Sequence, residues 1–108
     1  MYYARLVQFK LGTGKRQIAE KICKEYDSFN RNLTGFRGNV YFFDDLNGEY
    51  HTLNYWDTKQ DAENAHEILF PKFTAKLEKY TDEKIVYRIF EVFDTSENSG
   101  FFQSHLKL

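Results

Sequence analysis

The sequence has little cysteine and no long run of apolar residues. Its 108 residues include one cysteine, one proline and one tryptophan. The lone Cys23 cannot form an internal disulfide, and its position on the apolar stripe of an expected helix indicates a small buried side chain. No apolar run approaches the ~20 residues that a membrane-spanning helix needs, and the N-terminus has no signal-peptide pattern. We therefore expect a cytoplasmic protein without a membrane partner.

An excess of charge of one sign is also lacking. Lys and Arg number 15, Asp and Glu number 16, and the net charge is −1 at pH 7. Acidic and basic residues are interspersed along the chain, so no basic stripe is available for a phosphate backbone and we expect no nucleic-acid partner. A chain of this length forms one domain with one hydrophobic core.

Aromatic residues, in contrast, are abundant. The chain has 8 Tyr, 11 Phe and 1 Trp, which together make up 19% of it. Aromatic side chains bury large areas, and they can also line an apolar cavity. They therefore fill a core and an interface, or they enclose a small aromatic or apolar ligand, and one protein can do both.

Hydrophobic periodicity predicts six elements in the order strand, helix, strand, strand, helix, strand. Thr13 is expected to cap the first helix and Gly35 to end it. Thr58 is expected to cap the second helix, which Pro71 should kink or restart. The expected strands cover residues 2–11, 40–43, 50–56 and 85–93, the expected helices cover 15–33 and about 59–80, and Asn47-Gly48 forms the hairpin turn.

This order is the ferredoxin-like βαββαβ arrangement of the α+β class, with two helices on one face of a four-stranded antiparallel sheet. The strands at 40–43 and 85–93 are apolar on both faces, although the helices can bury only one. If this face were left bare, its apolar patch would be larger than the patches that monomers usually expose. We therefore expect a homodimeric α+β barrel with sheet packed on sheet. Alternatively, the C-terminal tail (95–108) folds back over this face of the domain (1–94). In a dimer, the same tail can instead contact the partner subunit.

Two segments resemble the antibiotic biosynthesis monooxygenase (ABM) domains of the dimeric α+β barrel superfamily. They are Gly35-Phe36-Arg37-Gly38 before a strand, and Leu53-Asn54-Tyr55-Trp56-Asp57-Thr58 between a strand and a helix. The likeness covers residues 2–93. It implies a homodimer with one small-molecule pocket per subunit, between the sheet and its helices. It also implies oxygen insertion into aromatic or quinol-like substrates without a metal or flavin cofactor.

Haem-degrading relatives place an Asn on the first strand and a Trp and a His on the second helix. The first strand here has no Asn, and Trp56 ends the third strand. We therefore expect no haem breakdown.

Cofactor-free oxygenation requires a base that removes a proton from the substrate in a dry pocket. We predict that His66 is this base, because an unperturbed histidine titrates near neutral pH. Helical spacing places His66 on the same face as Ala62, Ala65 and Leu69, which should look toward the sheet. The alternative is a core histidine that hydrogen-bonds a backbone carbonyl.

Asn54 and Trp56 are expected to complete the catalytic set by orienting the substrate and hydrogen-bonding its developing oxyanion. Trp56 alternatively packs between helix and sheet. Arg5 lies inside the first strand, where a charge is costly unless paired. It either holds an anionic ligand or forms a salt bridge with an acid such as Glu91 of a partner subunit. The expected substrate-binding residues are His51, Thr52, Tyr55, Phe73 and Arg5, and no metal ligands are expected.

Two functions follow from these patterns. The first is a small-molecule monooxygenase that uses no cofactor. The second is a non-catalytic or stress-related dimeric barrel that holds a small aromatic or apolar ligand.

Overall fold

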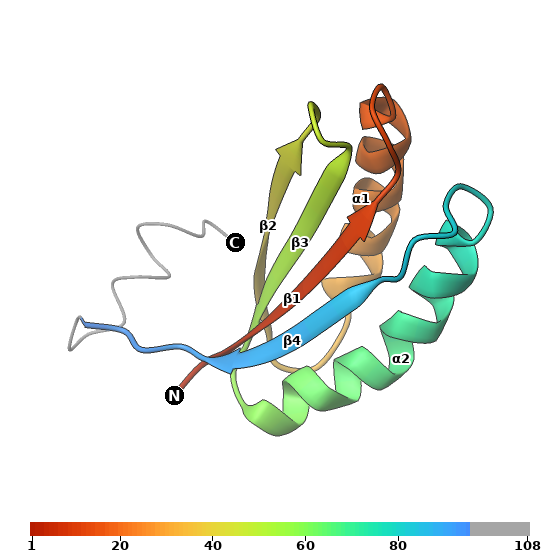
Figure 1. The fold of residues 1–108 in the computed structure, drawn as a ribbon. Coiled ribbons are helices and arrows are strands. Elements are labelled where there is room, and N and C mark those ends of the chain that lie inside the picture. Colours follow the sequence, from red (N-terminus) through yellow and green to blue (C-terminus); the bar gives the residue numbers. More distant parts are fainter. Residues whose placement is uncertain (96–108) are drawn as a thin grey trace.

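Two helices pack against one face of a four-stranded antiparallel sheet (Figure 1). The computed structural model describes residues 1–95. The strand order β2-β3-β1-β4 puts β3 and β1 at the centre of the sheet and confirms the predicted ferredoxin-like α+β fold. The elements are β1 (Tyr3–Lys10), α1 (Arg16–Asn30), β2 (Phe36–Asp44), β3 (Glu49–Trp56), α2 (Lys59–Leu77) and β4 (Val86–Glu91).

Strand alternation turns every second side chain of β1 toward the helices. Val7 and Phe9 are 1% and 0% exposed on this side. Antiparallel pairing sets Arg5 opposite Asn54 of β3 and Ile89 of β4. Residues directly opposite each other in a sheet project to the same face. The register therefore brings a charged side chain and an amide side chain together beneath the helices.

The first helix begins later and ends earlier than the sequence pattern predicted. It starts after Lys15 without a side-chain cap, and the Thr13 hydroxyl donates instead to the carbonyl oxygen of Leu46 (3.3 Å). The helix ends at Asn30, well before Gly35. The capping roles predicted for Thr13 and Gly35 are therefore wrong.

Gly35 instead shapes the connection between α1 and β2. Its φ of 81° is a left-handed conformation that favours glycine. A Cβ at this position would overlap the side chain of Asp61 in the first turn of α2. The Gly35 carbonyl accepts a hydrogen bond from the Asp57 N–H (2.8 Å). The loop after α1 is therefore packed against the start of α2.

The second helix begins as predicted and continues through its proline. The Thr58 hydroxyl oxygen accepts the backbone N–H of Asp61 (3.0 Å) and so caps α2. Pro71 does not restart the helix, which continues to Leu77. A proline removes one intrahelical hydrogen bond and bends a helix, and α2 curves along the sheet in Figure 1. Neither helix in the described part of the chain is long and apolar enough to cross a membrane.

An aromatic cluster joins both helices to the sheet. Phe73 of α2 makes edge contacts with Phe9 of β1 and Tyr26 of α1, with ring centroids 5.2 Å and 5.1 Å apart. Cys23 lies in the same helix layer and is 4% exposed. Burial raises the pKa of the Cys23 thiol to about 12, so the thiol is protonated at neutral pH. The prediction of a buried, unreactive cysteine is confirmed.

The other face of the sheet is largely apolar, and neither α1 nor α2 covers it. Phe42 and Val86 are 47% and 48% exposed on this face. The role predicted for the C-terminal tail falls mostly on residues 96–108, which lie outside the described residues. One apolar cluster on this face is formed by Ala4, Tyr55, Tyr2, Val40, Leu53 and Val92.

We expect two copies of the chain to pack through this open face, because burying it removes a continuous apolar surface from water. The unmodified protein should sediment at micromolar concentration with about twice its chain mass of 12.9 kDa. Phe42→Asp should lower the average mass, since it places a carboxylate in the dry contact.

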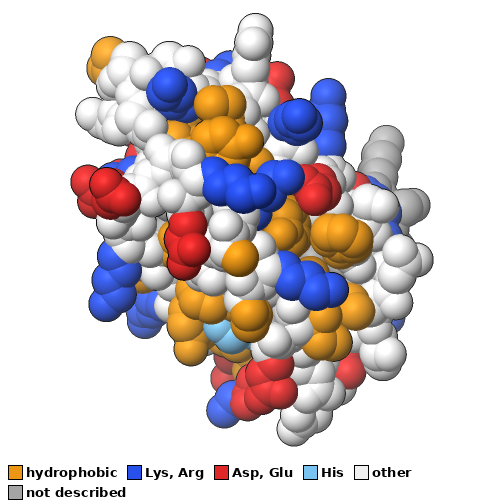
Figure 2. All heavy atoms as spheres, turned by 90° about the vertical axis from the view of Figure 1, so that its right-hand side faces the viewer, with side chains coloured by type: hydrophobic (Ala, Val, Ile, Leu, Met, Phe, Trp, Pro, Cys, Tyr) orange, Lys and Arg blue, Asp and Glu red, His pale blue; other side chains and the backbone are white. Residues whose placement is uncertain are grey.

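Ile68→Asp provides the matched control. Ile68 lies on α2 and has the same 47% exposure as Phe42. On the α2 side of the molecule, apolar side chains are interspersed with charged ones (Figure 2). The Ile68→Asp variant should therefore remain dimeric. A monomeric unmodified protein, or equal masses for both variants, would contradict the expectation.

Candidate functional site: a cavity between the sheet and the helices

A small cavity lies between the sheet and the two helices. It offers about 20 Å³ to the centres of water-sized molecules, and one water needs roughly 10–15 Å³ by this measure. A water or the head group of a larger ligand therefore fits without movement of the walls. The lining residues are Arg5 and Val7 of β1, Tyr41 of β2, Thr52 and Asn54 of β3, Tyr26 and Asn30 of α1, and Leu69 and Phe73 of α2.

Arg5 is a buried cation in the wall of this cavity. Arg5 is 3% exposed, and burial lowers the pKa of its guanidinium to about 10. Arg5 therefore remains charged at neutral pH. The Nε–H donates to Nδ1 of His66 (2.9 Å). Within residues 1–95, no carboxylate forms an ion pair with Arg5.

The salt bridge predicted between Arg5 and an acid of a partner subunit stays a prediction. The Arg5 side chain is enclosed between the sheet and the helices of its own subunit. In the strand register, Ile89 is the residue opposite Arg5. Glu91 lies two positions further along β4, opposite Tyr3. The partner of Arg5 within the described chain is a neutral imidazole.

His66 bridges α2 and the sheet. Its ring stacks on Tyr87 of β4 and on Phe70 of α2, with centroids 3.8 Å and 4.5 Å apart. An arginine Nε can only donate, so Nδ1 of His66 must accept and the ring proton resides on Nε2. Burial, followed by the charge of Arg5, lowers the pKa of His66 to about 4. The ring is therefore neutral at pH 7.

This hydrogen bond limits what His66 can do as a base. The one lone pair of the neutral ring is already engaged by Arg5. His66 contacts Arg5 but is not among the residues that line the cavity; it lines instead an open surface groove with Tyr3 and Tyr87. It can accept a proton only after the bond to Arg5 is broken.

Asn54 and Trp56 form a buried pair at the end of β3. The indole Nε1–H of Trp56 donates to Oδ1 of Asn54 (2.8 Å), and the two residues are 0% and 1% exposed, respectively. This bond fixes the orientation of the Asn54 amide. Since the oxygen is engaged, the group that Asn54 can offer to a ligand is its NH₂.

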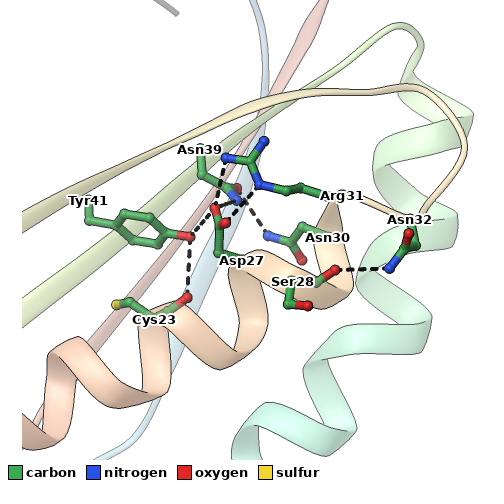
Figure 3. A network of polar contacts seen from close by, with 8 residues as sticks. All are labelled: Cys23, Asp27, Ser28, Asn30, Arg31, Asn32, Asn39 and Tyr41. Carbon is green, nitrogen blue, oxygen red and sulfur yellow. Dashed lines mark hydrogen bonds and ion pairs between the residues drawn. The ribbon is translucent and has the colours of Figure 1, made fainter. Parts of the chain in front are cut away.

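A polar network centred on Asp27 joins α1 to β2 on the other side of the cavity (Figure 3). The Asp27 carboxylate accepts hydrogen bonds from Arg31 (2.8 Å), Asn39 (2.5 Å) and the Tyr41 hydroxyl (3.1 Å). Burial opposes the charge of Asp27, but these three donors together lower its pKa. Asn39 also accepts from the Asn30 amide (3.0 Å), so the network positions two cavity-lining residues, Asn30 and Tyr41.

The structure brings together four of the predicted site residues and separates two others from them. Arg5, Thr52, Asn54 and Phe73 all line the cavity. Trp56 and His66 each hydrogen-bond one of these residues.

His51 and Tyr55 lie on the open face of the sheet, because odd and even positions of β3 project to opposite faces. They cannot share a binding site with Arg5 within one subunit.

Tyr26, Asn30 and Tyr41 line the cavity but were not predicted from the sequence. Asn30 follows Tyr26 by four residues, so it lies on the same helical face. The apolar pattern did not include it because its side chain is polar. Its Oδ1 is buried without a hydrogen-bond partner, which marks an incompletely satisfied wall of the cavity.

The low pKa of His66 predicts a pH-dependent stability. The unfolded chain binds this proton near pH 6.5 and the folded chain near pH 4. The unfolded state therefore holds more protons between these values, and the free energy of unfolding should rise with pH through this interval. The contribution is complete above pH 6.5 and is lost as the pH falls to 4. The full shift corresponds to about 3 kcal/mol, and solvent screening of the partly exposed ring reduces the contribution below this value.

Urea unfolding of the His66→Gln variant tests this prediction. The variant should lack this part of the pH dependence between pH 4 and 6.5, while the carboxylates contribute equally to both proteins. His51→Gln, on the open face, is the control and should keep it. An identical pH dependence in the His66→Gln variant and the unmodified protein would contradict the assigned pKa.

No protein-family model matches the sequence, and no curated protein sequence matches it either. Solved structures, however, match the fold over most of the chain. Rv0793 from Mycobacterium tuberculosis superposes with a TM-score of 0.70 at 10% identity, covering 89% of this chain and 99% of that one. A provisionally named antibiotic biosynthesis monooxygenase from Nitrosomonas europaea gives a TM-score of 0.71 at 11% identity, covering 88% and 93%.

A third similar structure is SnoaB from Streptomyces nogalater, described as a cofactor-independent oxygenase. Its TM-score is 0.69 at 12% identity, covering 87% of this chain and 95% of SnoaB. Identities this low establish a shared fold and leave the activity open. The chain has the fold of the antibiotic biosynthesis monooxygenases, as the sequence resemblance implied.

Proposed function

We propose that the chain is a cofactor-free monooxygenase that binds an aromatic or quinol-like substrate in the cavity between its sheet and helices. The observation that carries this proposal is the buried cation of Arg5 in a cavity with aromatic and aliphatic walls. Cofactor-free oxygenation proceeds through a substrate anion, and a fixed cation in a dry site stabilises that anion. The fold shared with SnoaB supports the same reaction class.

The reaction requires only the substrate and oxygen. An activated methylene or phenol group loses a proton, and the resulting carbanion transfers an electron to O₂. The radical pair then combines to form a peroxide. For a methylene group, loss of water from this peroxide gives a carbonyl, so that CH₂ and O₂ become C=O and H₂O. The substrate supplies all the electrons, and the protein supplies binding, charge stabilisation and exclusion of bulk water.

Arg5 and Asn54 take the two main roles in this scheme. The Arg5 guanidinium faces the negative charge of the ionised substrate, and the Asn54 NH₂ donates a hydrogen bond to the same oxygen. Trp56 keeps the Asn54 amide in the donating orientation through its 2.8 Å bond. Thr52 and Phe73 contact the substrate from β3 and α2.

His66 acts in this proposal as a positioning residue for Arg5. The sequence pattern assigned it the role of proton acceptor, but its lone pair is engaged and its pKa is about 4. A cation beside the bound substrate lowers the substrate's own pKa, so the proton can leave to water before or during binding.

A non-catalytic ligand-binding protein is the second candidate function. The observation that favours it is the lack of a free base in the cavity lining, in which no residue carries an imidazole or a carboxylate. Such a protein would hold the same aromatic ligand in the same place without oxidising it.

Oxygen uptake with anthrone-like and quinol substrates separates the two functions. The monooxygenase should consume one O₂ per molecule of substrate oxidised, above the rate without protein. Asn54→Ala should lower kcat on the order of 10²-fold, as for loss of one oxyanion donor. Asn64→Ala, on the exposed face of α2, removes the same amide and should leave the rate unchanged.

Substrate binding without oxygen uptake would favour the binding protein. Equal rates for the Asn54→Ala variant and the unmodified protein would contradict the role given to Asn54. Haemin with a reductant serves as a compound that the protein should not degrade. Its Soret band should persist as in the protein-free control.

A further inference from the structure

The charge of Arg5 has no counter-ion among the described residues. The residue is 97% buried, since its exposed fraction is 3%. Within residues 1–95, its one hydrogen bond to another side chain goes to a neutral ring, that of His66. A buried cation that no anion compensates costs several kcal/mol. The fold nevertheless holds the guanidinium in the wall of a cavity, where a ligand can compensate its charge.

The other groups around the cavity complement a planar organic anion. Asn54 offers the NH₂ of its fixed amide, and Thr52, a residue that is 7% exposed, contributes a hydroxyl group. Tyr26 and Phe73 provide aromatic walls. A cation with a neighbouring amide donor matches the oxygen atoms of an ionised acid, and aromatic walls match a flat ring.

The position of Pro71 gives such a ring a way to enter. Leu69 and Phe73 line the cavity on either side of it in α2. Proline donates no backbone hydrogen bond, so this turn of α2 has one intrahelical hydrogen bond fewer than a regular helix. Outward movement of this turn would enlarge the cavity from a space for a head group to a space for a ring.

We propose that the natural ligand of this cavity is an aromatic acid that binds as its monoanion, with its oxyanion against the guanidinium of Arg5 and the amide NH₂ of Asn54. This inference rests on the site assigned under the proposed function and adds the charge class of the substrate. It holds whether the bound molecule is oxidised or only held.

The fluorescence of the single tryptophan reports on binding, because Trp56 is buried and hydrogen-bonded to Asn54. Benzoate and benzamide are the probes, since they share a shape and differ in charge. Benzoate should change the Trp56 emission in a saturable way and bind at least about 10-fold more tightly than benzamide. Sodium chloride at equal ionic strength should not reproduce the change.

Arg5→Met tests the assignment to one residue. Methionine keeps an unbranched apolar chain and removes the charge, so benzoate affinity should fall on the order of 30-fold or more, with benzamide affinity nearly unchanged. Arg88→Met is the control, because Arg88 lies over the Phe90 ring on β4, away from the cavity. It should keep the affinity of the unmodified protein.

Equal affinities for benzoate and benzamide in the unmodified protein would overturn the proposal, and this comparison decides the question even if Arg5→Met does not fold. A response to chloride equal to that to benzoate would overturn it too, by showing a site for inorganic anions. Oxygen uptake is a separate readout. Arg5-dependent benzoate binding without uptake of O₂ would support the charge assignment and reject the monooxygenase. Uptake of O₂ together with equal binding of benzoate and benzamide would support the monooxygenase and reject the charge assignment.

Discussion

The hydrogen bond between Arg5 Nε and His66 Nδ1 is the interaction on which the site depends. It joins residues 61 positions apart, one in a central strand and one in the second helix. It fixes the tautomer of the imidazole, it holds the guanidinium in the wall of the cavity, and the charge that it brings near the ring contributes to the low pKa of His66. One bond therefore sets both the position of the cation and the chemistry of the histidine.

The cavity is held open by two polar connections, one for each helix. The Arg5–His66 bond joins α2 to β1, and the Asp27 network joins α1 to β2. Buried polar groups are costly when unsatisfied, but a satisfied network fixes a single arrangement. The two connections differ in charge. Asp27 has donors that compensate its carboxylate, whereas Arg5 faces the cavity without a counter-ion among residues 1–95. This asymmetry gives the cavity its preference for an anion.

Much of the fold could be predicted from the sequence, because it depends on local periodicity. Alternation located the strands β1 and β4, and the helical spacing of α2 placed Leu69 on the side that faces the sheet, where the structure has it. The helix boundaries were less accessible. The Thr13 hydroxyl donates to the carbonyl oxygen of Leu46 in the turn between β2 and β3, and Gly35 packs against Asp61. Neither contact has a sequence signature.

The site was predicted only in part, for a related physical reason. Strand and helix phase indicate which face a residue occupies, so His66 was expected on the face of α2 that looks toward the sheet. Phase does not indicate which side chains meet across that layer. The pairing of Arg5 with a neutral histidine depends on the angle of α2 over the sheet, and it changed the predicted base into a positioning residue. His51 was placed in the site although its neighbour Thr52 projects to the opposite face.

Scalar coupling between nitrogen nuclei across the Arg5–His66 hydrogen bond is the most direct test of this account. In protein labelled with ¹⁵N, the Arg5 Nε–H should show a coupling to an unprotonated His66 Nδ1, and the His66 Nε2 should carry the ring proton at pH 7. Loss of the coupling in the Arg5→Met variant would identify the pair. A His66 ring protonated at Nδ1, or one that titrates near pH 6.5 without any coupling to Arg5, would contradict the arrangement from which the site and its proposed ligand are derived.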